Sequence, residues 1–137
     1  MAVTKKASYG LIAAVEIARS PANAPVSAAA IADRYSLPLP FVEKILRQLR
    51  LRGVVRSKQG RYGGYSLCAN AEDVSVRHVL EALDENLDLV SCLGSQVTCD
   101  LDAVCPTKRT WGRINQRFLD LLGSLSLKDL ADGSEQE

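Results

Sequence analysis

Residues 40–65 decide the fold, and they read PFVEKILRQLRLRGVVRSKQGRYGGY. The first half carries apolar residues at helical spacing between Phe41 and Leu49, with charged residues on the remaining faces. A proline at its start suits the first turn of a helix, and Gly53 suits the left-handed position that commonly follows one. We therefore expect an amphipathic, basic helix over about 40–52.

The second half of the stretch predicts a β-hairpin. Residues 54–58 and 64–68 are short, strand-like segments, and the linker between them is rich in glycine. Glycines at 60, 63 and 64 suit a tight tip, because glycine adopts turn conformations that other residues avoid. A basic helix followed by such a hairpin is the order found in a winged helix-turn-helix.

The sequence before this stretch completes that motif. Ser8 can cap a first helix that runs to about Arg19, and Ser27 can cap a second helix over 28–35. Two prolines within residues 36–40, SLPLP, forbid a continuous helix between the second and the third. We expect a short helix, a break and a recognition helix, in that order.

Three further segments follow the hairpin. A fourth helix is expected from Ser75 to about Glu85, and a long amphipathic helix from Thr107 to about Leu122. A polar stretch with three cysteines lies between them, and residues 126–130 can add one last helical turn. The long helix carries an apolar stripe that needs a partner surface, and packing across a two-fold axis supplies one. The stripe consists of Trp111, Ile114, Phe118, Leu121 and Leu122.

These segments predict a mainly α-helical protein with a small β-hairpin wing. We expect a winged helix-turn-helix DNA-binding domain over residues 1–85 and a cysteine-bearing cluster loop over 86–106. A dimerisation helix over 107–130 and a flexible tail over 131–137 complete the chain. The length of 137 residues suits one domain with an appended element.

Composition excludes several functional classes. The chain is 47% hydrophobic and 24% charged, which is ordinary for a globular protein, and no apolar run approaches the ~20 residues that span a bilayer. Glu16 and Arg19 interrupt the first apolar run, which argues against a signal peptide and for a cytoplasmic protein without a membrane partner. His78 is the sole histidine, and no nucleophile–base pair or phosphate-binding glycine motif indicates an enzyme.

Charge is distributed unevenly along the chain. Residues 1–66 carry eleven basic and three acidic side chains, a net +8, whereas residues 67–137 have a net charge of −7. Seven of the eleven basic residues lie between Lys44 and Arg61. Because Lys and Arg neutralise phosphates, the expected partner is a double-stranded DNA operator. The candidate DNA-binding residues are Lys5, Pro40, Phe41, Glu43, Lys44, Arg47, Arg50, Ser57, Lys58, Gly60, Arg61, Tyr62 and Gly63.

Glu43 leaves two interpretations open. A carboxylate on a recognition helix can accept a hydrogen bond from the N4 amino group of cytosine. It can equally pair with Arg47 one turn along the helix, a contact typically worth about 0.3–0.5 kcal/mol. At the hairpin tip, Arg61 is suited to a narrow minor groove, while Tyr62 is more simply a packing or phosphate contact.

Three of the four cysteines fall in one stretch. Cys92, Cys99 and Cys105 have the spacing C-x6-C-x5-C, which is wide enough for a loop to wrap around a polynuclear cluster. Structural zinc more often uses C-x2–4-C pairs. Spacing alone leaves an iron–sulfur cluster, a zinc site and redox thiols open. Cys68 stands apart on the hairpin, where we interpret it as a small buried hydrophobic residue.

Taken together, these features resemble the IscR-type family of iron–sulfur transcriptional regulators, which includes the nitric-oxide-sensing repressor and the rhizobial iron regulator. The resemblance covers about residues 1–130. Its last part is a three-cysteine loop just before a tryptophan-bearing helix. The other residues that carry it are Tyr9, Ile31-Ala32-Asp33-Arg34, Phe41-Val42-Glu43-Lys44, Leu49-Arg50, Gly53-Val54-Val55, Ser57, Gly60 and Gly63-Gly64-Tyr65.

The resemblance implies a homodimer formed through the long C-terminal helix. It also implies that Cys92, Cys99 and Cys105 hold an iron–sulfur cluster, 2Fe–2S or 4Fe–4S, between that helix and the DNA-binding domain. In such regulators the presence or type of the cluster, a group labile enough to be lost on isolation, sets operator affinity. Iron–sulfur supply, oxidants or nitric oxide would then be the signal.

The chain departs from that family at three places. Lys108 stands where relatives often have a histidine as fourth ligand, and Ser8 stands where some have an acidic residue of the partner's first helix. The fourth ligand is therefore unassigned among Asp100, Asp102, water and a small thiol. In the wing, residues 59–61 read Gln-Gly-Arg in place of Arg-Gly-Pro, so the operator need not match that of relatives.

Overall fold

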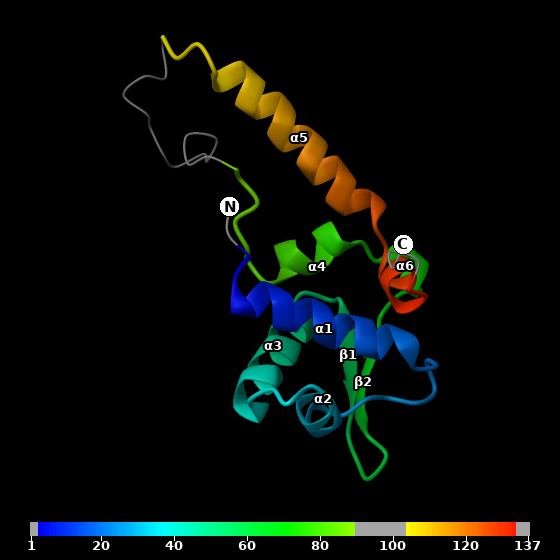
Figure 1. The fold of residues 1–137 in the computed structure, drawn as a ribbon. Helices are drawn as coiled ribbons and strands as arrows, with labels where there is room; N and C mark the ends of the chain where they lie inside the picture. Colours follow the sequence, from blue (N-terminus) through cyan, green and yellow to red (C-terminus); the bar gives the residue numbers. More distant parts are fainter. Residues whose placement is uncertain (1–2, 90–103, 134–137) are drawn as a thin grey trace.

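The computed structural model describes residues 3–89 and 104–133 of the chain. In Figure 1 a two-stranded hairpin projects below a group of short helices, and one long helix rises on the opposite side. The elements in chain order are α1 (Lys5–Arg19), α2 (Ala28–Tyr35), α3 (Leu39–Leu51), β1 (Val55–Lys58), β2 (Gly64–Leu67), the 3-10 helix η1 (Ala71–Asp73), α4 (Val76–Ala82), α5 (Lys108–Ser124) and α6 (Leu127–Ala131).

The predicted mainly helical fold with a hairpin wing is confirmed. Helix α2 has its predicted bounds, because the Ser27 hydroxyl accepts a hydrogen bond from the backbone N–H of Ala30 at 3.1 Å. Helix α3 lies within one residue of its predicted bounds, and Gly53, just after it, has a φ of +79°. That left-handed residue ends the helix and turns the chain into the hairpin.

Two predicted helix boundaries were wrong. Helix α1 starts at Lys5 rather than after Ser8, because the side chain of Thr4 accepts a hydrogen bond from the N–H three residues on, at 3.0 Å. Helix α4 ends at Ala82, three residues earlier than expected. The cause is Asp84, whose φ of +58° is incompatible with a right-handed helix.

The main apolar core lies among α1, α2, α3 and α4. At Gly10 an added Cβ would lie 2.2 Å from Cδ1 of the fully buried Leu83, so this glycine lets α1 pack directly on α4. Both residues therefore fix the distance between those helices. The largest side chains that the fold buries completely include Ile31, Ile45, Leu46, Leu49, Leu83 and Leu127.

The hairpin is tied to the segment that leads into α2. Strand β1 pairs antiparallel with β2, and Lys58 opposite Gly64 closes the pairing at the tip. Val26 forms a bridge to Tyr65, with N–H to O distances of 2.9 and 2.7 Å. A Cβ on Gly64 would lie 2.6 Å from the carbonyl carbon of Val26, so only glycine permits this approach. The wing is thereby held beside α2 and α3.

The C-terminal segment forms two helices that meet at a bend. The chain leaves helical geometry at Leu125, and Ser126 and Asp129 then form a reciprocal capping box at the start of α6. Helix α6 packs on α1, and Ala131, which was expected in a flexible tail, ends α6. Residues 134–137 of that tail lie outside the described residues.

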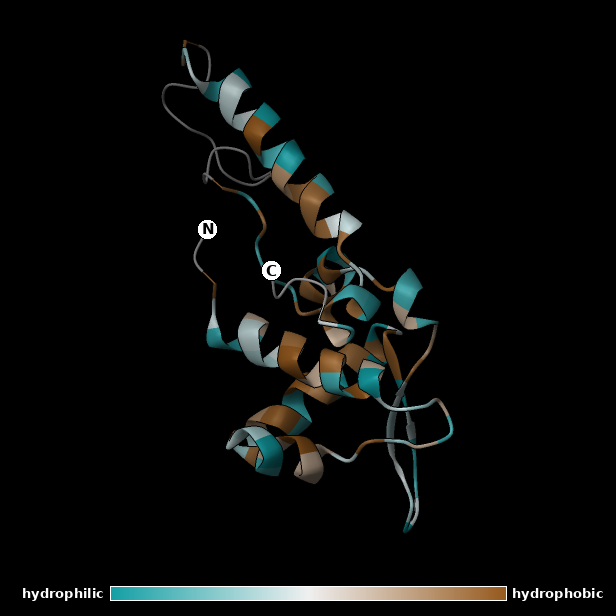
Figure 2. Ribbon diagram, turned by 45° about the vertical axis from the view of Figure 1, so that its right-hand side comes forward, coloured by the Kyte–Doolittle hydropathy of each residue, from teal (hydrophilic) through white to brown (hydrophobic). Residues whose placement is uncertain are grey.

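Helix α5 contacts the domain mainly through its C-terminal half. Leu119, Leu122 and Leu125 pack against an apolar cluster that includes Leu80 of α4 and Leu87. In Figure 2 the helix mixes hydrophobic and hydrophilic residues and its N-terminal half extends away from the rest of the domain. This arrangement leaves part of its apolar surface uncovered within one subunit.

Candidate nucleic-acid interface

A concave surface of about 480 Å³ lies between α3, the hairpin and the start of α2. We refer to it as the reading groove. Its two sides are the exposed face of α3 and the wing, which are the elements that the sequence assigned to DNA binding. The residues that line it are Ser27, Ala28, Glu43, Arg47, Arg50, Ser57, Lys58, Gln59, Gly60, Gly63, Gly64 and Tyr65.

Helix α3 presents one polar face to this groove. Glu43, Arg47 and Arg50 are four and three residues apart, a spacing that places them along the same side of a helix. The buried residues of α3, Val42, Ile45, Leu46 and Leu49, occupy the other side and hold the helix on the core. The amphipathic pattern therefore fixes which side chains meet an outside partner.

Among the residues that the structure describes, the basic side chains of the groove form no ion pair. Arg47, Arg50 and Lys58 are all exposed. The ion pairs within residues 3–89 and 104–133 are Arg34–Glu16, Arg52–Asp84 and Arg77–Glu81. The basic side chains of the reading groove are therefore available to bind a polyanion such as a phosphate backbone.

The structure bears on the two interpretations of Glu43. Glu43 is exposed and lines the groove, and in the described part of the chain it forms no ion pair with Arg47. The intrahelical pair is therefore not what holds this carboxylate. Its position in the groove is compatible with accepting a hydrogen bond from a base edge.

The wing tip depends on two of its glycines. Gly60 has a φ of +111°, which side chains rarely allow. At Gly63 an added Cβ would lie only 2.1 Å from the backbone oxygen of Lys58. These two residues shape the turn itself, so Arg61 and Tyr62 are held at its end.

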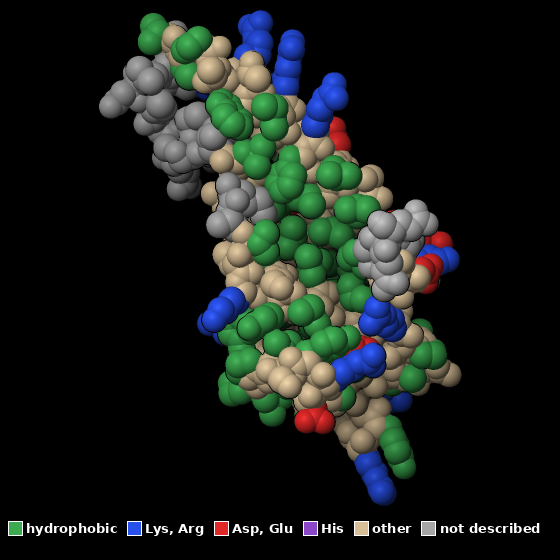
Figure 3. Space-filling model, in the orientation of Figure 1, with side chains coloured by type: hydrophobic (Ala, Val, Ile, Leu, Met, Phe, Trp, Pro, Cys, Tyr) green, Lys and Arg blue, Asp and Glu red, His purple; other side chains and the backbone are tan. Residues whose placement is uncertain are grey.

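Arg61 and Tyr62 are exposed at the tip of the wing. The guanidinium carbon of Arg61 lies 5.7 Å from the ring centroid of Tyr62, and the tyrosine is 79% exposed. Neither lines the reading groove, yet the hairpin that carries them projects beyond the helices at the bottom of Figure 3. They are placed to reach farther than the groove itself.

The structure brings seven of the thirteen predicted residues to the groove: Glu43, Arg47, Arg50, Ser57, Lys58, Gly60 and Gly63. Phe41 is half-buried and packs edge-on against Tyr9, with ring centroids 5.6 Å apart and planes at 87°. Its contact is thus within the fold. Lys5, Pro40 and Lys44 are exposed outside the groove lining.

Sequence reasoning missed the contribution of α2. Ser27 and Ala28, at its N-terminus, line the groove. The backbone N–H groups at a helix N-terminus favour anions, so this end adds a site suited to phosphate. The sequence predicts Ser27 as a helix cap and predicts the order of the helices. Only the Val26–Tyr65 bridge, however, brings this end beside the wing.

The cysteine site is only partly within the described residues. Cys105 is half-buried and lies two residues before Thr107, the N-cap of α5. Its Sγ lies 3.4 Å from the Oγ1 of Thr107. Cys92 and Cys99 lie outside the described residues. Three thiols within fourteen residues are nevertheless a donor set suited to iron–sulfur ligation.

The prediction for Cys68 was wrong. Its side chain is exposed rather than buried, while Ser66, two residues earlier on β2, is buried. The Ser66 hydroxyl donates a hydrogen bond to the carbonyl of Ala22 at 3.4 Å. Cys68 therefore has no role in the core.

The predicted dimerisation stripe is partly exposed. Trp111, Ile114 and Leu121 are 38%, 44% and 57% exposed, whereas Phe118 and Leu122 are half-buried. Leu122 packs on the apolar cluster that includes Leu80 and Leu87 of the same chain. Figure 3 shows hydrophobic side chains gathered along α5. Among the described residues, no helix combines the length and the apolar character that crossing a membrane requires.

Comparison with protein families gives one match that spans nearly the whole chain. Residues 3–133 match Rrf2, a family described as an iron-dependent transcriptional regulator. The HTH-type transcriptional regulator IscR of Pectobacterium atrosepticum is 32% identical over 135 residues, which cover 98% of this chain and 82% of that protein.

Two solved structures are similar over nearly the whole chain. CymR of B. subtilis, described as the global cysteine regulator, superposes with a TM-score of 0.81 at 29% identity and covers 96% of this chain and 97% of its own. IscR of T. potens superposes with a TM-score of 0.77 at 27% identity and covers 99% of this chain and 90% of its own.

Proposed function

The chain belongs to the Rrf2 family, and on that premise we propose that it is a homodimeric regulator whose operator affinity is controlled through Cys92, Cys99 and Cys105. Membership of the family makes it a DNA-binding transcriptional regulator and not an enzyme.

The reading groove is the single observation that carries the DNA-contacting surface. An α-helix fits the major groove of B-DNA, and α3 presents Glu43, Arg47 and Arg50 on the side that faces away from the core. Lys58 and Arg61 on the wing are placed for adjacent phosphates or the minor groove. Their lack of ion pairs within the described residues supports this assignment.

The exposed stripe of α5 supports a homodimer. Trp111, Ile114 and Leu121 are apolar, lie on the long helix and remain exposed in one subunit. Self-association through a two-fold axis would cover the stripe and place two reading grooves on one duplex. Helix-turn-helix dimers bind half-sites about one turn of DNA apart, roughly 34–36 Å.

We assign control to an iron–sulfur cluster held by Cys92, Cys99 and Cys105, of either 2Fe–2S or 4Fe–4S type. The donor set fits, because thiolates are the usual ligands of such clusters. When bound, the cluster would supply a redox-active group sensitive to iron supply and oxidants. Lys108 is the first residue of α5, and a lysine is a poor fourth ligand while protonated, so a non-lysine ligand completes the set.

A thiol switch or a zinc site on the same cysteines is the second candidate. The structural similarity to CymR of Staphylococcus aureus, one structure of which is described as the oxidized form, favours the thiol switch. Both candidates place the control at Cys92, Cys99 and Cys105. They differ in metal content, which makes them separable by analysis of the purified protein.

The experiment is anaerobic purification followed by absorption spectroscopy and by iron, sulfide and zinc analysis. We expect a brown protein with iron and sulfide that loses both in Cys92→Ala, Cys99→Ala and Cys105→Ala. Cys68→Ala is the matched control, because this cysteine is exposed on the hairpin and should leave the colour unchanged. A colourless protein with one zinc per chain, or with no metal, would refute the cluster in favour of the second candidate.

A further inference from the structure

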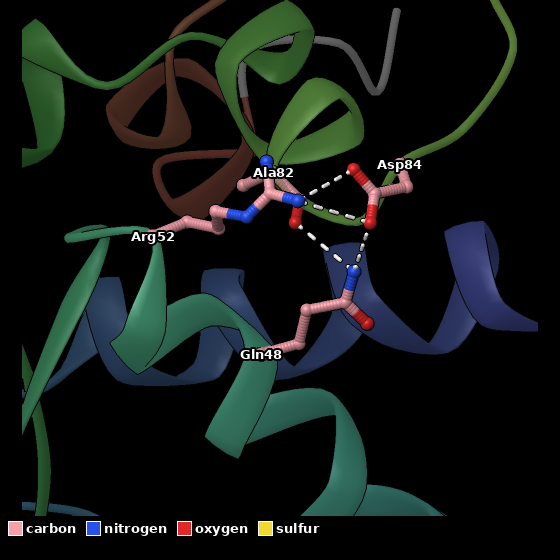
Figure 4. A network of polar contacts seen from close by, with 4 residues as sticks. All are labelled: Gln48, Arg52, Ala82 and Asp84. Carbon is pink, nitrogen blue, oxygen red and sulfur yellow. Dashed lines mark hydrogen bonds and ion pairs between the residues drawn. The ribbon is translucent and has the colours of Figure 1, made fainter.

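The end of α4 contacts the recognition helix through the carboxylate of Asp84 and the backbone carbonyl of Ala82 (Figure 4). Arg52 Nη2 donates hydrogen bonds to Asp84 Oδ1 at 2.9 Å and to Oδ2 at 3.1 Å. Gln48 Nε2 donates to the same Oδ2 at 3.1 Å and to the carbonyl oxygen of Ala82 at 3.3 Å. Gln48 and Arg52 are one helical turn apart, so Asp84 holds a full turn at the C-terminal end of α3.

These contacts lie away from the reading groove. Arg47 and Arg50 line the groove, whereas Gln48 and Arg52 do not. Because α3 is a rigid element, a shift of its C-terminal turn must also move the side chains that face the groove. Asp84 is therefore placed to influence DNA contacts that it does not itself make.

The backbone of Asp84 gives a second, independent observation. Its N–H donates to the carbonyl of Glu81 at 3.0 Å, and the N–H of Glu85 donates to the carbonyl of Leu80 at 3.1 Å. This is the Schellman arrangement, whose left-handed position is most often glycine. Asp84 occupies that position at a φ of +58°. Glycine would serve the turn better, so the aspartate is explained by what its side chain holds.

The segment that follows Asp84 leads to the cysteines and is tied at two more points. The Glu85 carboxylate accepts a hydrogen bond from the hydroxyl of Thr4, the N-cap of α1. The N–H of Leu89 donates to Oδ1 of the buried Asn115 on α5, at 2.7 Å. Residues 84–89 thus connect the recognition helix to the long helix directly before the cysteine-bearing stretch.

We propose that Gln48, Arg52 and Asp84 are positioning residues that couple the state of the cysteine-bearing stretch to the orientation of the recognition helix. This inference rests on the proposed control of DNA affinity by the cysteines. A shift at Leu89 or Asn115 is carried along residues 84–89 to Asp84, and from there to the C-terminal turn of α3. Coupling of this kind is a difference in DNA affinity between two states of one protein.

A purely stabilising role is the competing explanation, and the exposure of the pair argues against it. The side chains of Arg52 and Asp84 are 51% and 56% exposed, and solvent-exposed ion pairs contribute little to stability. The Arg77–Glu81 pair is comparably exposed but joins two residues of α4 alone. It therefore provides a matched control that cannot link two elements.

The test compares DNA affinity of anaerobically reconstituted protein with that of chelator-treated, metal-free protein. Asp84→Gly keeps the left-handed turn and removes only the carboxylate, and Arg52→Gln removes the partner. We expect the wild type to change affinity by about tenfold or more between the two states, and each variant by less than about twofold. Glu81→Gln should respond as the wild type does. In the double variant Asp84→Gly/Arg52→Gln, the change in DNA affinity between the two states should equal that of either single variant. Both substitutions remove the same contact between Arg52 and Asp84.

A second readout does not depend on the cluster. In metal-free protein, amide hydrogen exchange over residues 48–53 should be about tenfold faster in Asp84→Gly than in Glu81→Gln, although the global unfolding midpoint of Asp84→Gly should be no lower. If the wild type shows no difference between its two states, the proposed control of DNA affinity by the cluster fails. If the wild type responds and Asp84→Gly responds equally, with unchanged exchange over 48–53, the coupling role is wrong while the proposed function stands.

Discussion

The two sides of the recognition helix use their arginines differently. On the groove side, Arg47 and Arg50 are exposed and form no ion pair within the described part of the chain. On the other side, Arg52 is bound to Asp84, as Arg34 of α2 is bound to the carboxylate of Glu16. The arginines on the groove side are available to bind a partner, whereas Arg52 joins α3 to the segment after α4.

This difference separates the residues that set DNA affinity from those that set how the helices pack. A cation without an ion pair contributes to phosphate binding with little effect on the fold, whereas a paired cation fixes how helices meet. Sequence alone cannot make the distinction, because both groups are arginines within the same basic stretch.

The largest effect is expected on the groove side. The double variant Arg47→Ala/Arg50→Ala should weaken operator binding by about 100-fold at roughly 0.1 M salt, because each contact with a base or phosphate is worth about 1–3 kcal/mol. The slope of log affinity against log salt should fall in magnitude by about 2 if both contact phosphates. Fluorescence anisotropy over a salt series measures both.

The control for this variant is Arg77→Gln, in which an arginine of α4 outside the groove is changed. It should bind DNA as the wild type does. Urea unfolding of the double variant should also stay close to that of the wild type. Unchanged DNA binding by Arg47→Ala/Arg50→Ala would show that the reading groove is not the DNA-contacting surface.

A smaller effect is expected from the frame that holds the groove. Gly63→Ala puts a Cβ against the backbone oxygen of Lys58, which cannot move without opening the hairpin. We expect stability to fall by roughly 1–3 kcal/mol and DNA affinity by about tenfold, because the wing is displaced. Calorimetry and anisotropy on the same preparation measure the two effects.

Gly112→Ala is the matched control, because a Cβ on this glycine of α5 would meet no atom within 4 Å. This change should raise stability by roughly 0.5–1 kcal/mol, as alanine replaces glycine in a helix. Equal effects of the two substitutions would mean that the tight approach at Gly63 does not shape the wing.

The smallest effect is expected from a contact that joins two helices, between Tyr35 of α2 and Glu16 of α1. The hydroxyl of Tyr35 donates a hydrogen bond to Glu16, and this bond, together with burial, raises the pKa of Tyr35 above its ordinary value. Tyr35→Phe should therefore lower stability by about 1 kcal/mol at pH 7 and leave DNA affinity unchanged. Urea unfolding and anisotropy provide the two measurements.

The pH dependence of this effect has a definite sign. A raised pKa means that the folded state favours the protonated phenol, so the contribution is present below a pH of about 10 and lost as pH rises through the folded-state pKa. The stability difference between wild type and Tyr35→Phe should shrink above that pH. A difference that stays constant from pH 7 to 11 would contradict the role of the Tyr35 proton.

Local signals in the sequence predicted most elements but not their junctions. Ser27 caps α2 as expected, because a cap and its acceptor lie three residues apart. The early end of α4 was missed, because the left-handed Asp84 is held by Arg52 and Gln48, far away in the chain. The close packing at Gly10 was missed for the same reason, since it depends on Leu83 of another helix.

The candidate site, like the fold, was predicted where it depends on neighbouring residues and missed where it depends on distant ones. The basic helix and glycine-rich hairpin predicted a DNA-binding surface and seven of the residues that line the groove. The contribution of Ser27 and Ala28 was missed, because the start of α2 reaches the groove only through the bridge between Val26 and Tyr65. The roles of Cys92 and Cys99 stay predictions, since both lie outside the described residues.

The winged-helix order and the polar face of α3 were predictable from the order of the residues, because they depend on residues within a few positions of one another. Which arginines remain available to bind DNA follows from the three-dimensional contacts. Arg50 and Arg52 are two residues apart in one basic run, yet Arg50 lines the groove and Arg52 binds Asp84. The physical reason is that charge is local to a side chain, whereas its partner is chosen by contacts between distant parts of the chain.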